Sequence, residues 1–370
     1  MRAVSPRRAS EEATPVELDS SRALLTVRTY IDDIAPRWDE FVRNNPGGTP
    51  FHLTAWKRCI EETYGYKSQY FYVERDGKIT AVVPVFSVSN WITGQCLLST
   101  PFAVYGGVCS DDAESENVLV QHLQRLGESQ SVEYLELRYK KHTPREGFSP
   151  VSRYATFTAE LSSDSEANLK RLPKDTRYMI RKAAKSPLRG QHGIDQLDAF
   201  YRLFCQSMKR LGTPVFPLSL FKNLIEEFDP AVDLYIVYLG TDPVAGVFSL
   251  FYRDTIFPYY AGATQNANSL AANNFMYWEL MKYAVERGCR KFDFGRSKLG
   301  TGAYNFKSQW NMDVHVLDYQ VYLIKRKDIP NFSPINPKFD LATRIWKRVP
   351  ESLANWGEVR SEERRVGKEC

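Results

Sequence analysis

The sequence is organised around one stretch, KFDFGRSKLGTGAYNFK at residues 291–307. The alternation of its first residues predicts a short strand, in which Asp293 points away from its two phenylalanine neighbours. Gly295 ends this strand, and two further glycines frame a turn before a helix-compatible run over residues 303–310. We therefore expect a strand, a glycine-rich turn and a short helix in close succession.

Cationic side chains crowd this turn. Arg296, Lys298 and Lys307 surround backbone that glycine leaves bare, which suits an anionic or carbonyl-bearing ligand. The alternative is that the glycines only turn the chain between two strands while the cations stay solvated. The stretch predicts a binding site, and the sequence leaves that alternative open.

A phosphate-binding loop is excluded at the same place. The spacing from Gly295 to Gly300 resembles that motif, but Thr301 and Gly302 stand where it needs Lys followed by Ser or Thr. We therefore reject a nucleotide hydrolase.

The composition indicates a globular protein with two domains. The chain has 370 residues, of which 43% are hydrophobic and 25% charged, and this length exceeds a usual single core. A net charge of +5 does not by itself imply that the protein binds nucleic acid. An anionic partner would have to bind to a local cluster of basic residues. No apolar run approaches the roughly 20 residues that span a bilayer, and the N-terminus lacks the apolar core of a secretion signal. We expect a cytoplasmic protein.

Metal and covalent chemistry find little support. The six cysteines include no C-x-x-C pair, and the five histidines show no metal-ligand spacing, so we predict no metal and no disulfide. No Ser-His-Asp or Cys-His pair can be argued from linear spacing. Direct transfer to an acceptor amine suits this inventory better than a covalent enzyme intermediate.

The predicted elements repeat one order, which indicates a mixed α/β fold with an internal duplication. Strand, helices, antiparallel strands, helix and strand occur on both sides of about residue 155. Within this scheme, residues 102–108 continue the first sheet and residues 314–325 return as one strand. The alternative is one large mixed sheet.

The domain limits follow from this order. We predict a disordered N-terminus over residues 1–22, a first domain over 23–155, a second domain over 156–330, a C-terminal amphipathic helix over 331–360 and a tail over 361–370. The tail resembles translated adapter sequence and is excluded from the fold. The amphipathic helix has a partly basic face, which suits packing on the second domain or docking on a membrane surface.

A basic helix is predicted near residue 174. Lys174, Arg177, Arg181 and Lys185 fall within about 80° of arc, with apolar side chains opposite. Such a stripe can hold a diphosphate of a nucleotide-linked or lipid-linked substrate through charge-assisted hydrogen bonds. A solvated face is the equally weighted alternative.

The central stretch also resembles a known family. The run DFGRSK-x-GTG-x-Y-x-FK at residues 293–307 resembles the C-terminal signature of FemAB-type transferases and related tandem GNAT-class acyltransferase domains. It is most similar to FemAB-related proteins encoded with exosortase (PEP-CTERM) and exopolysaccharide systems. The resemblance covers about residues 24–325 and implies two tandem GNAT-like domains with mixed central sheets flanked by helices.

The resemblance implies an activity. A FemAB-like transferase would move an acyl or aminoacyl group onto an amine of a cell-envelope or exopolysaccharide precursor, at the inner face of the membrane. The donor would be aminoacyl-tRNA or acyl-CoA, with no permanently bound cofactor. The acceptor would be an anionic nucleotide sugar, lipid-linked or peptidyl precursor. The alternatives are an acetyl-CoA-dependent N-acetyltransferase and a non-catalytic module that binds an anionic glycan or lipid precursor.

The resemblance also implies roles for residues of the motif. Lys307 would stabilise the developing oxyanion and Phe306 would shape the channel, while Tyr304 is a substrate-binding residue of the same segment. Asp293 is a candidate general base, and the alternative is that it anchors the Gly300 turn by hydrogen bonds.

Further substrate-binding residues are expected around this motif. They comprise the basic helix with Lys174, Arg177 and Arg181, the turn residues Arg296 and Ser297, the tyrosines Tyr259 and Tyr260, and the helix-start asparagines Asn273 and Asn274. The two tyrosines could equally be core. GNAT acetyltransferases carry a Q/R-x-x-G-x-G/A loop at the strand-to-helix junction, which QNANSL at residues 265–270 does not reproduce, and this disfavours acetyl-CoA. We expect Lys307 and Arg181 to face one shared hollow.

Overall fold

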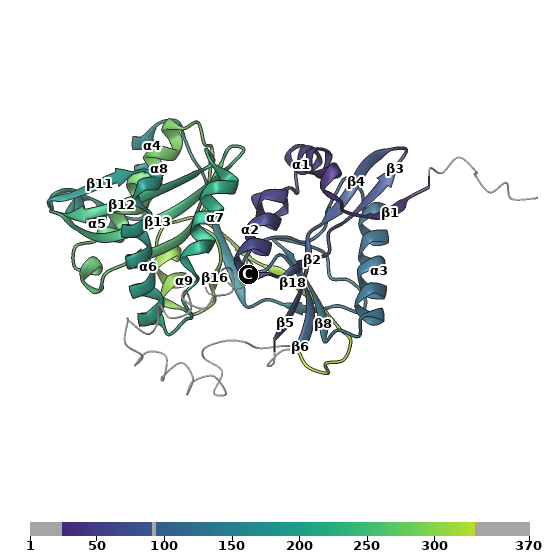
Figure 1. Ribbon diagram of the computed structural model, residues 1–370. Helices are drawn as coiled ribbons and strands as arrows, with labels where there is room; N and C mark the ends of the chain where they lie inside the picture. Colours follow the sequence, from purple (N-terminus) through teal and green to yellow (C-terminus); the bar gives the residue numbers. More distant parts are fainter. Residues whose placement is uncertain (1–23, 91–93, 330–370) are drawn as a thin grey trace, which may run out of the picture.

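The computed structural model describes residues 24–90 and 94–329, which form two lobes (Figure 1). The predicted N-terminal segment, C-terminal amphipathic helix and tail lie outside the described residues. Within the described ranges, no helix is long and apolar enough to cross a membrane.

The first lobe contains two sheets and three α-helices among its described residues. One sheet has the order β1-β3-β4-β7 and the other β2-β5-β6-β8-β18-β9, in which β18 (Asp318–Leu323) comes from a later part of the chain. Helix α3 packs against β3, β4 and β8, and its apolar face contributes Leu119 and Leu123 to the core. The elements are β1 (Thr26–Thr29), α1 (Ala35–Asn44), α2 (Thr54–Tyr64), β2 (Lys67–Ser68), β3 (Phe71–Arg75), β4 (Lys78–Val83), β5 (Val85–Asn90), β6 (Gly94–Ser99), β7 (Cys109–Ser110), α3 (Ala113–Ser129), β8 (Tyr134–Tyr139) and β9 (Ser149–Val151).

The second lobe is built on one eight-stranded sheet. Its order is β11-β12-β13-β14-β15-β10-β16, and β17 pairs with β10. The elements are β10 (Tyr154–Glu160), α4 (Ser165–Arg171), α5 (Lys174–Ala184), β11 (Leu188–His192), α6 (Leu197–Leu211), α7 (Leu218–Phe228), β12 (Val232–Leu239), β13 (Asp242–Tyr252), β14 (Thr255–Ala263), α8 (Ala272–Glu286), β15 (Lys291–Asp293), β16 (Ser297–Lys298), α9 (Gly302–Ser308) and β17 (Asp313–Val316).

The central strands of this sheet are buried on both faces. Leu234 and Ile236 of β12 pack with α6 and α7, whereas the alternate residues Tyr235 and Val237 pack with α5 and α8. Because both faces are covered, the strand reads as a continuous apolar run rather than an alternating one.

Both lobes contain the same crossover unit. Strands β6 and β8 are parallel, with Leu97 opposite Leu135, and helix α3 connects them. Strands β14 and β15 are also parallel, with Ile256 opposite Phe292, and helix α8 connects them. The repeated element order of the sequence therefore corresponds to a repeated strand-helix-strand unit.

The two lobes share one hydrophobic cluster. Helix α2 packs against α7, and Trp56 contacts Phe228 with ring centroids 6.4 Å apart. The Phe51 ring lies 5.0 Å from that of Tyr259 in the second lobe. Because apolar side chains from both lobes are buried together, the interface resembles a continuous core more than a surface contact.

The predicted strand over residues 314–325 is wrong as a single element. The chain breaks at Leu317, so that β17 pairs with β10 whereas β18 (Asp318–Leu323) pairs with β8 and β9 of the first lobe. Figure 1 shows β18 among the strands of the first lobe. Leu317 is fully buried where the chain crosses between lobes. The predicted limits of the two domains stay predictions, and β18 joins the two halves.

The predicted strand over residues 102–108 is also wrong. This segment is a loop with positive φ at Thr100, Phe102 and Gly106. The amides of Gly106 and Gly107 both donate to the carbonyl oxygen of Arg138 at 3.1 and 2.8 Å, which folds the loop onto the end of β8. A Cβ at Gly106 would lie 1.6 Å from the Thr100 hydroxyl, so the loop needs glycine there.

Candidate functional site

Lys307 closes the turn that follows β15. Its ammonium donates to the carbonyl oxygens of Phe294 at 2.6 Å, Gly295 at 3.1 Å and Arg296 at 3.4 Å. Gly295 has a φ of 68°, which lets these carbonyls converge on one cation. Burial lowers the pKa of Lys307 to about 8, although the neighbouring Asp293 raises it. The structure therefore holds a partly desolvated cation at this turn.

Asp293 lies in a buried hydrogen-bond network. Its Oδ1 accepts from the Thr156 hydroxyl at 2.7 Å and the Gly295 amide at 2.9 Å, and its Oδ2 accepts from the Tyr105 hydroxyl at 2.8 Å. These contacts fit the anchoring role better than that of a base, because both oxygens already accept hydrogen bonds. The turn that it anchors is the one at Gly295, not the one at Gly300.

Arg296 lies between aromatic rings at the lobe interface. Its guanidinium stands 4.7 Å from the centroid of the Tyr154 ring and donates to the Tyr319 hydroxyl at 3.2 Å. The Tyr319 hydroxyl in turn donates to Val104 O at 2.6 Å. This cation is thus held in a cation–π and hydrogen-bonded arrangement that links the lobes.

Three of the expected substrate-binding residues pack against neighbouring rings. The ring centroids of Tyr304 and Phe157 are 5.2 Å apart, and those of Phe306 and Trp310 are 6.0 Å apart. The sequence left Tyr260 either as a substrate-binding residue or as part of the core. Its side chain is only 8% exposed, which supports the core position. It lies in the cluster of Phe204, Phe216, Phe221 and Phe248.

Tyr259 is half-buried and reaches the first lobe. Its hydroxyl donates to Phe102 O at 2.7 Å, and this hydrogen bond joins the first-lobe loop before β7 to the sheet of the second lobe. Ser297 is buried, and its hydroxyl has no hydrogen-bond partner among the described residues.

The basic stripe of α5 is only partly free. Ile180 and Ala183 are buried as expected, and Lys174 and Arg181 are exposed. Arg177 differs, because its guanidinium donates to Lys170 O at 3.0 Å and to Leu172 O, which lie at the end of α4. Its expected ligand contact is replaced by a helix C-terminal contact of the kind that basic side chains commonly make.

The start of α8 holds the two expected asparagines. Asn273 is half-buried and Asn274 is buried, in the first turn of the helix. A short 3-10 helix over Gln265–Asn268 precedes them, where the sequence lacks the loop motif of GNAT acetyltransferases.

A cleft of about 560 Å³ lies between the lobes, and we call it the interlobe cleft. Asp293 and Tyr105 line it, whereas Lys307, Lys174 and Arg181 do not. The expectation that Lys307 and Arg181 share one hollow is therefore not met by this cleft. Its lining comprises residues 46–49, 105–108, 138–140, 158–160, 252–255 and 291–293, together with His52, Phe257, Asp313 and His315.

Charged groups of both signs face the interlobe cleft. The cations Arg138 and Lys140 belong to the first lobe, whereas Arg253 and Lys291 belong to the second, which also contributes the His315 ring. The imidazole Nε2 of His315 lies 3.0 Å from the Thr158 hydroxyl. The carboxylates of the cleft are those of Glu160, Asp254, Asp293 and Asp313. Acidic groups in such a cleft suit an amine, which is cationic before it reacts.

Sequence reasoning missed His315. The histidines were expected to be core fillers or surface residues, because no linear spacing joins them to a partner. His315 meets Thr158 only because β17 pairs with β10, over a separation of 157 positions. The residues next to His315 in the sequence give no indication that it contacts Thr158.

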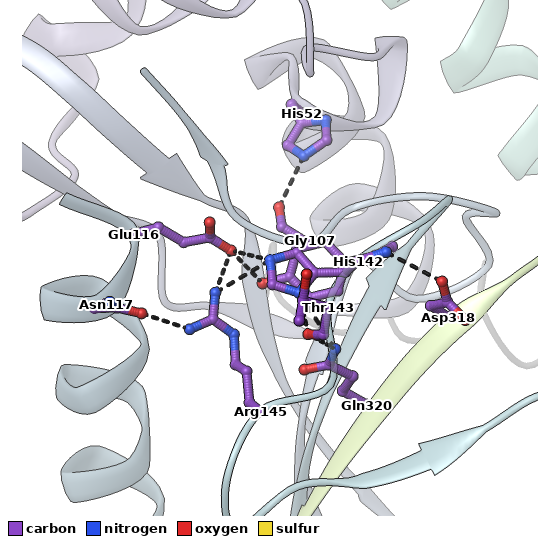
Figure 2. Close-up of polar contacts among 10 residues, drawn as sticks. His52, Gly107, Glu116, Asn117, His142, Thr143, Arg145, Asp318 and Gln320 are labelled. Atoms are coloured by element: carbon purple, nitrogen blue, oxygen red, sulfur yellow. Dashed lines mark hydrogen bonds and ion pairs between the residues drawn. The ribbon is translucent and has the colours of Figure 1, made fainter. Parts of the chain in front are cut away.

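The first-lobe wall of the cleft is held by an ion-pair cluster (Figure 2). Glu116 accepts hydrogen bonds from His142 Nε2 at 2.8 Å and from the Arg145 guanidinium. His142 Nδ1 lies 2.6 Å from Thr143 O, so both ring nitrogens face acceptors when the ring is protonated, and Nε2 also lies 3.2 Å from the Arg145 guanidinium. The hydrogen bond to Glu116 raises the pKa of His142. This cluster fixes the segment that carries Lys140.

His52 forms another part of the wall. Its Nε2 donates to Gly107 O at 2.9 Å, and its Nδ1 accepts from the Thr49 hydroxyl at 2.7 Å (Figure 2 shows the former contact). Burial lowers the pKa of His52 to about 4, so the ring is neutral and both nitrogens are used.

Comparisons with known proteins agree on the fold. Residues 170–308 match the family model described as an acetyltransferase (GNAT) domain. A structure of FemX is 14% identical with a TM-score of 0.63, over 86% of this chain and 100% of that one. A tandem GNAT protein from the clavulanic acid biosynthesis pathway is 8% identical with a TM-score of 0.53, over 82% of this chain and 100% of that one. No curated protein matches the sequence.

A third solved structure extends this set. The C-terminal domain of a putative lysylphosphatidylglycerol synthetase from Agrobacterium fabrum is 10% identical with a TM-score of 0.53, over 78% of this chain and 92% of that one. The expected mixed α/β fold with GNAT-like domains is confirmed. The domain match supports the predicted acyltransferase.

Proposed function

We propose that the protein transfers an activated acyl or aminoacyl group to an amine and forms an amide. The observation that carries this proposal is the Lys307 ammonium, held by three carbonyls at the end of β15 inside the acetyltransferase match. Attack of an amine on an activated carbonyl places negative charge on the carbonyl oxygen, and a positioned cation stabilises that charge. The contact to Arg296 O is the longest at 3.4 Å, so the substrate oxygen would take its place.

The acceptor amine would bind in the interlobe cleft. Its carboxylates attract an ammonium group, and Asp293 lies both in the cleft lining and next to the turn that holds Lys307. On the resemblance of the central stretch, we place the acceptor among anionic cell-envelope or exopolysaccharide precursors of exosortase-associated systems. Lys140 and Lys291 would meet the anionic part of such a precursor.

The donor would lie on the other side of the turn. Lys174 and Arg181 are exposed on α5 and do not line the interlobe cleft, so they are available to a polyanionic donor. The segment Gln265–Asn268 also lacks the loop motif of GNAT acetyltransferases. The exposed cations and the missing motif together favour aminoacyl-tRNA as the donor. Action at the inner face of the membrane belongs to this proposal.

A second candidate is an acetyl-CoA-dependent N-acetyltransferase. The match of residues 170–308 to an acetyltransferase domain favours it. The two candidates share the amide-forming step and differ in the leaving group, which is a ribose oxygen in one and a thiolate in the other.

One experiment tests both candidates against a non-catalytic binding module. The purified chain is incubated with aminoacyl-tRNA or acetyl-CoA and a panel of primary amines that includes envelope precursors, and the mass gained by the acceptor is followed. The Lys307→Met variant should lose turnover and keep acceptor binding. Absence of any mass gain with both donors would overturn the proposed function.

A further inference from the structure

We infer that His315 takes the proton from the acceptor amine in the interlobe cleft, an inference that rests on the proposed function. An acceptor amine is protonated in water and must lose a proton before or during attack on a carbonyl. A base must therefore lie where the amine binds.

The position of His315 fits this role. It lies on β17 opposite Thr156 of β10, and Thr158 of the same strand is opposite both Asp313 and Asp293. His315, Thr158 and Asp293 all line the interlobe cleft. The base would thus stand in the same cavity as the carboxylates that attract the amine.

The hydrogen bonding of the ring leaves one nitrogen available. Nε2 of His315 lies 3.0 Å from the Thr158 hydroxyl, which can accept a hydrogen bond. Among residues 24–90 and 94–329, Thr158 is the only hydrogen-bond partner of this imidazole. With the proton on Nε2, the lone pair of Nδ1 is free to accept a proton.

Burial and two neighbouring lysines keep the His315 ring neutral. Burial lowers its pKa, and Lys140 and Lys141, which follow β8, lower it further. Asp313 on its own strand and Asp293 on β15 act in the opposite direction, but the pKa remains below its ordinary value. At neutral pH the ring is therefore a base and not an acid.

One carboxylate and two other histidines of this region are already committed to other contacts. Asp293 accepts three hydrogen bonds. His52 donates to Gly107 O and accepts from Thr49, and both nitrogens of His142 are engaged, Nδ1 by Thr143 O and Nε2 by Glu116. His315 is the ring of these three that retains a free lone pair among the described residues.

The step balances in atoms and charge. The bound ammonium first gives one proton to Nδ1 of His315, which releases it to solvent. The neutral amine nitrogen then forms a bond to the acyl carbon, and its second proton passes to Nδ1 of His315. The bond from the acyl carbon to the ester oxygen or thioester sulfur breaks with its electron pair. The leaving group takes a proton or remains a thiolate, and His315 returns its proton to solvent.

The test compares His315→Gln with a matched control. His192→Gln removes the imidazole on β11 that lies 2.6 Å from Asp233, outside the interlobe cleft. Initial rates are measured from pH 5 to 9 with acetyl-CoA and with aminoacyl-tRNA, using the acceptor that gains mass with the wild-type protein. We expect His315→Gln to lower kcat by about 10²-fold or more and to lose the acidic limb of the kcat profile. The His192→Gln variant should keep both.

A second variant separates proton transfer from structure. In His315→Ala, added imidazole should restore part of the lost rate at pH 8, because a free base can enter the vacated space. If His315→Gln keeps the wild-type rate, or loses activity equally at every pH while imidazole restores nothing, the inference is wrong. If the wild-type protein itself transfers nothing from either donor, the proposed function fails and this inference fails with it.

Discussion

Tyr105 of the first lobe donates its hydroxyl proton to Oδ2 of Asp293 in the second lobe, at 2.8 Å. Both side chains are buried. Asp293 also accepts from the amide of Gly295, whose carbonyl oxygen helps to hold Lys307. A residue of the first lobe therefore positions the cation proposed to act in the second lobe.

The Tyr105→Phe substitution should destabilise the protein and lower its activity. Loss of the hydroxyl leaves one oxygen of a buried carboxylate without its donor, which costs about 1–3 kcal/mol in the free energy of unfolding. The loosened turn should also lower kcat more than it changes KM for the acceptor. Urea denaturation and steady-state kinetics measure the two effects.

Tyr322→Phe is a matched control for this prediction. The Tyr322 hydroxyl donates to Glu128 at 2.6 Å at an exposed position, so its loss should change the free energy of unfolding by less than about 0.5 kcal/mol. Equal effects of the two substitutions would show that the bond between Tyr105 and Asp293 has no special weight.

Activity should fall on the alkaline side as Lys307 loses its proton. Its pKa is about 8, so the ammonium that stabilises the oxyanion is present below this pH and is lost above it. Lys307→Arg keeps a cation over the whole range and should show a lower kcat without this alkaline limb. An alkaline limb of equal midpoint in both proteins would contradict the assignment to Lys307.

The free energy of unfolding should also depend on pH through the ionisation of Lys307. Because the pKa of Lys307 in the folded state lies below its ordinary value of 10.5, the unfolded chain binds the proton more tightly. The free energy of unfolding of the wild type, relative to Lys307→Met, should therefore rise between about pH 8 and pH 10.5. Urea titrations of both proteins at several pH values provide the measurement.

Local sequence patterns were sufficient for much of the second lobe. The apolar back of α5 is buried at Ile180 and Ala183, and the turn after Asp293 ends its strand at a glycine with positive φ. These features depend on residues within a few positions of each other, so periodicity and glycine placement reveal them.

Long-range pairing could not be read in the same way. Tyr105 and Asp293 are 188 positions apart, and β18 leaves the strand before it to join the sheet of the other lobe. The interlobe cleft and His315 exist only after these pairings form. Arg177 was expected to meet a ligand for a different reason. Its partners, the carbonyl oxygens of Lys170 and Leu172, are close in sequence, but a stripe of charge does not show which backbone carbonyls a guanidinium will reach.

The His142→Gln substitution should cost stability in a pH-dependent way. Because the pKa of His142 is raised in the folded state, its contribution is fully present below its ordinary value of 6.5 and is lost as pH rises through the raised value. Below pH 6.5 we expect a loss of about 1–2 kcal/mol in the free energy of unfolding, since a charged hydrogen bond to Glu116 is removed. Urea titrations of the variant and the wild type at pH 6 and pH 9 should show a difference that shrinks at the higher pH. A difference independent of pH would mean that the ring acts by packing alone.

The exposed stripe of α5 should contribute to donor binding through charge. Lys174→Ala combined with Arg181→Ala removes two exposed cations that make no contact with the interlobe cleft. We expect the dissociation constant for aminoacyl-tRNA to rise about tenfold at low salt, and the difference to narrow as salt rises, because screening weakens the same contacts in the wild type. The pair Lys67→Ala and Lys78→Ala, at exposed positions of first-lobe strands and outside the cleft lining, serves as a charge-matched control. Filter binding from 50 to 300 mM salt separates the two pairs, and equal losses in both would show that the charge of the whole protein, and not this stripe, attracts the donor.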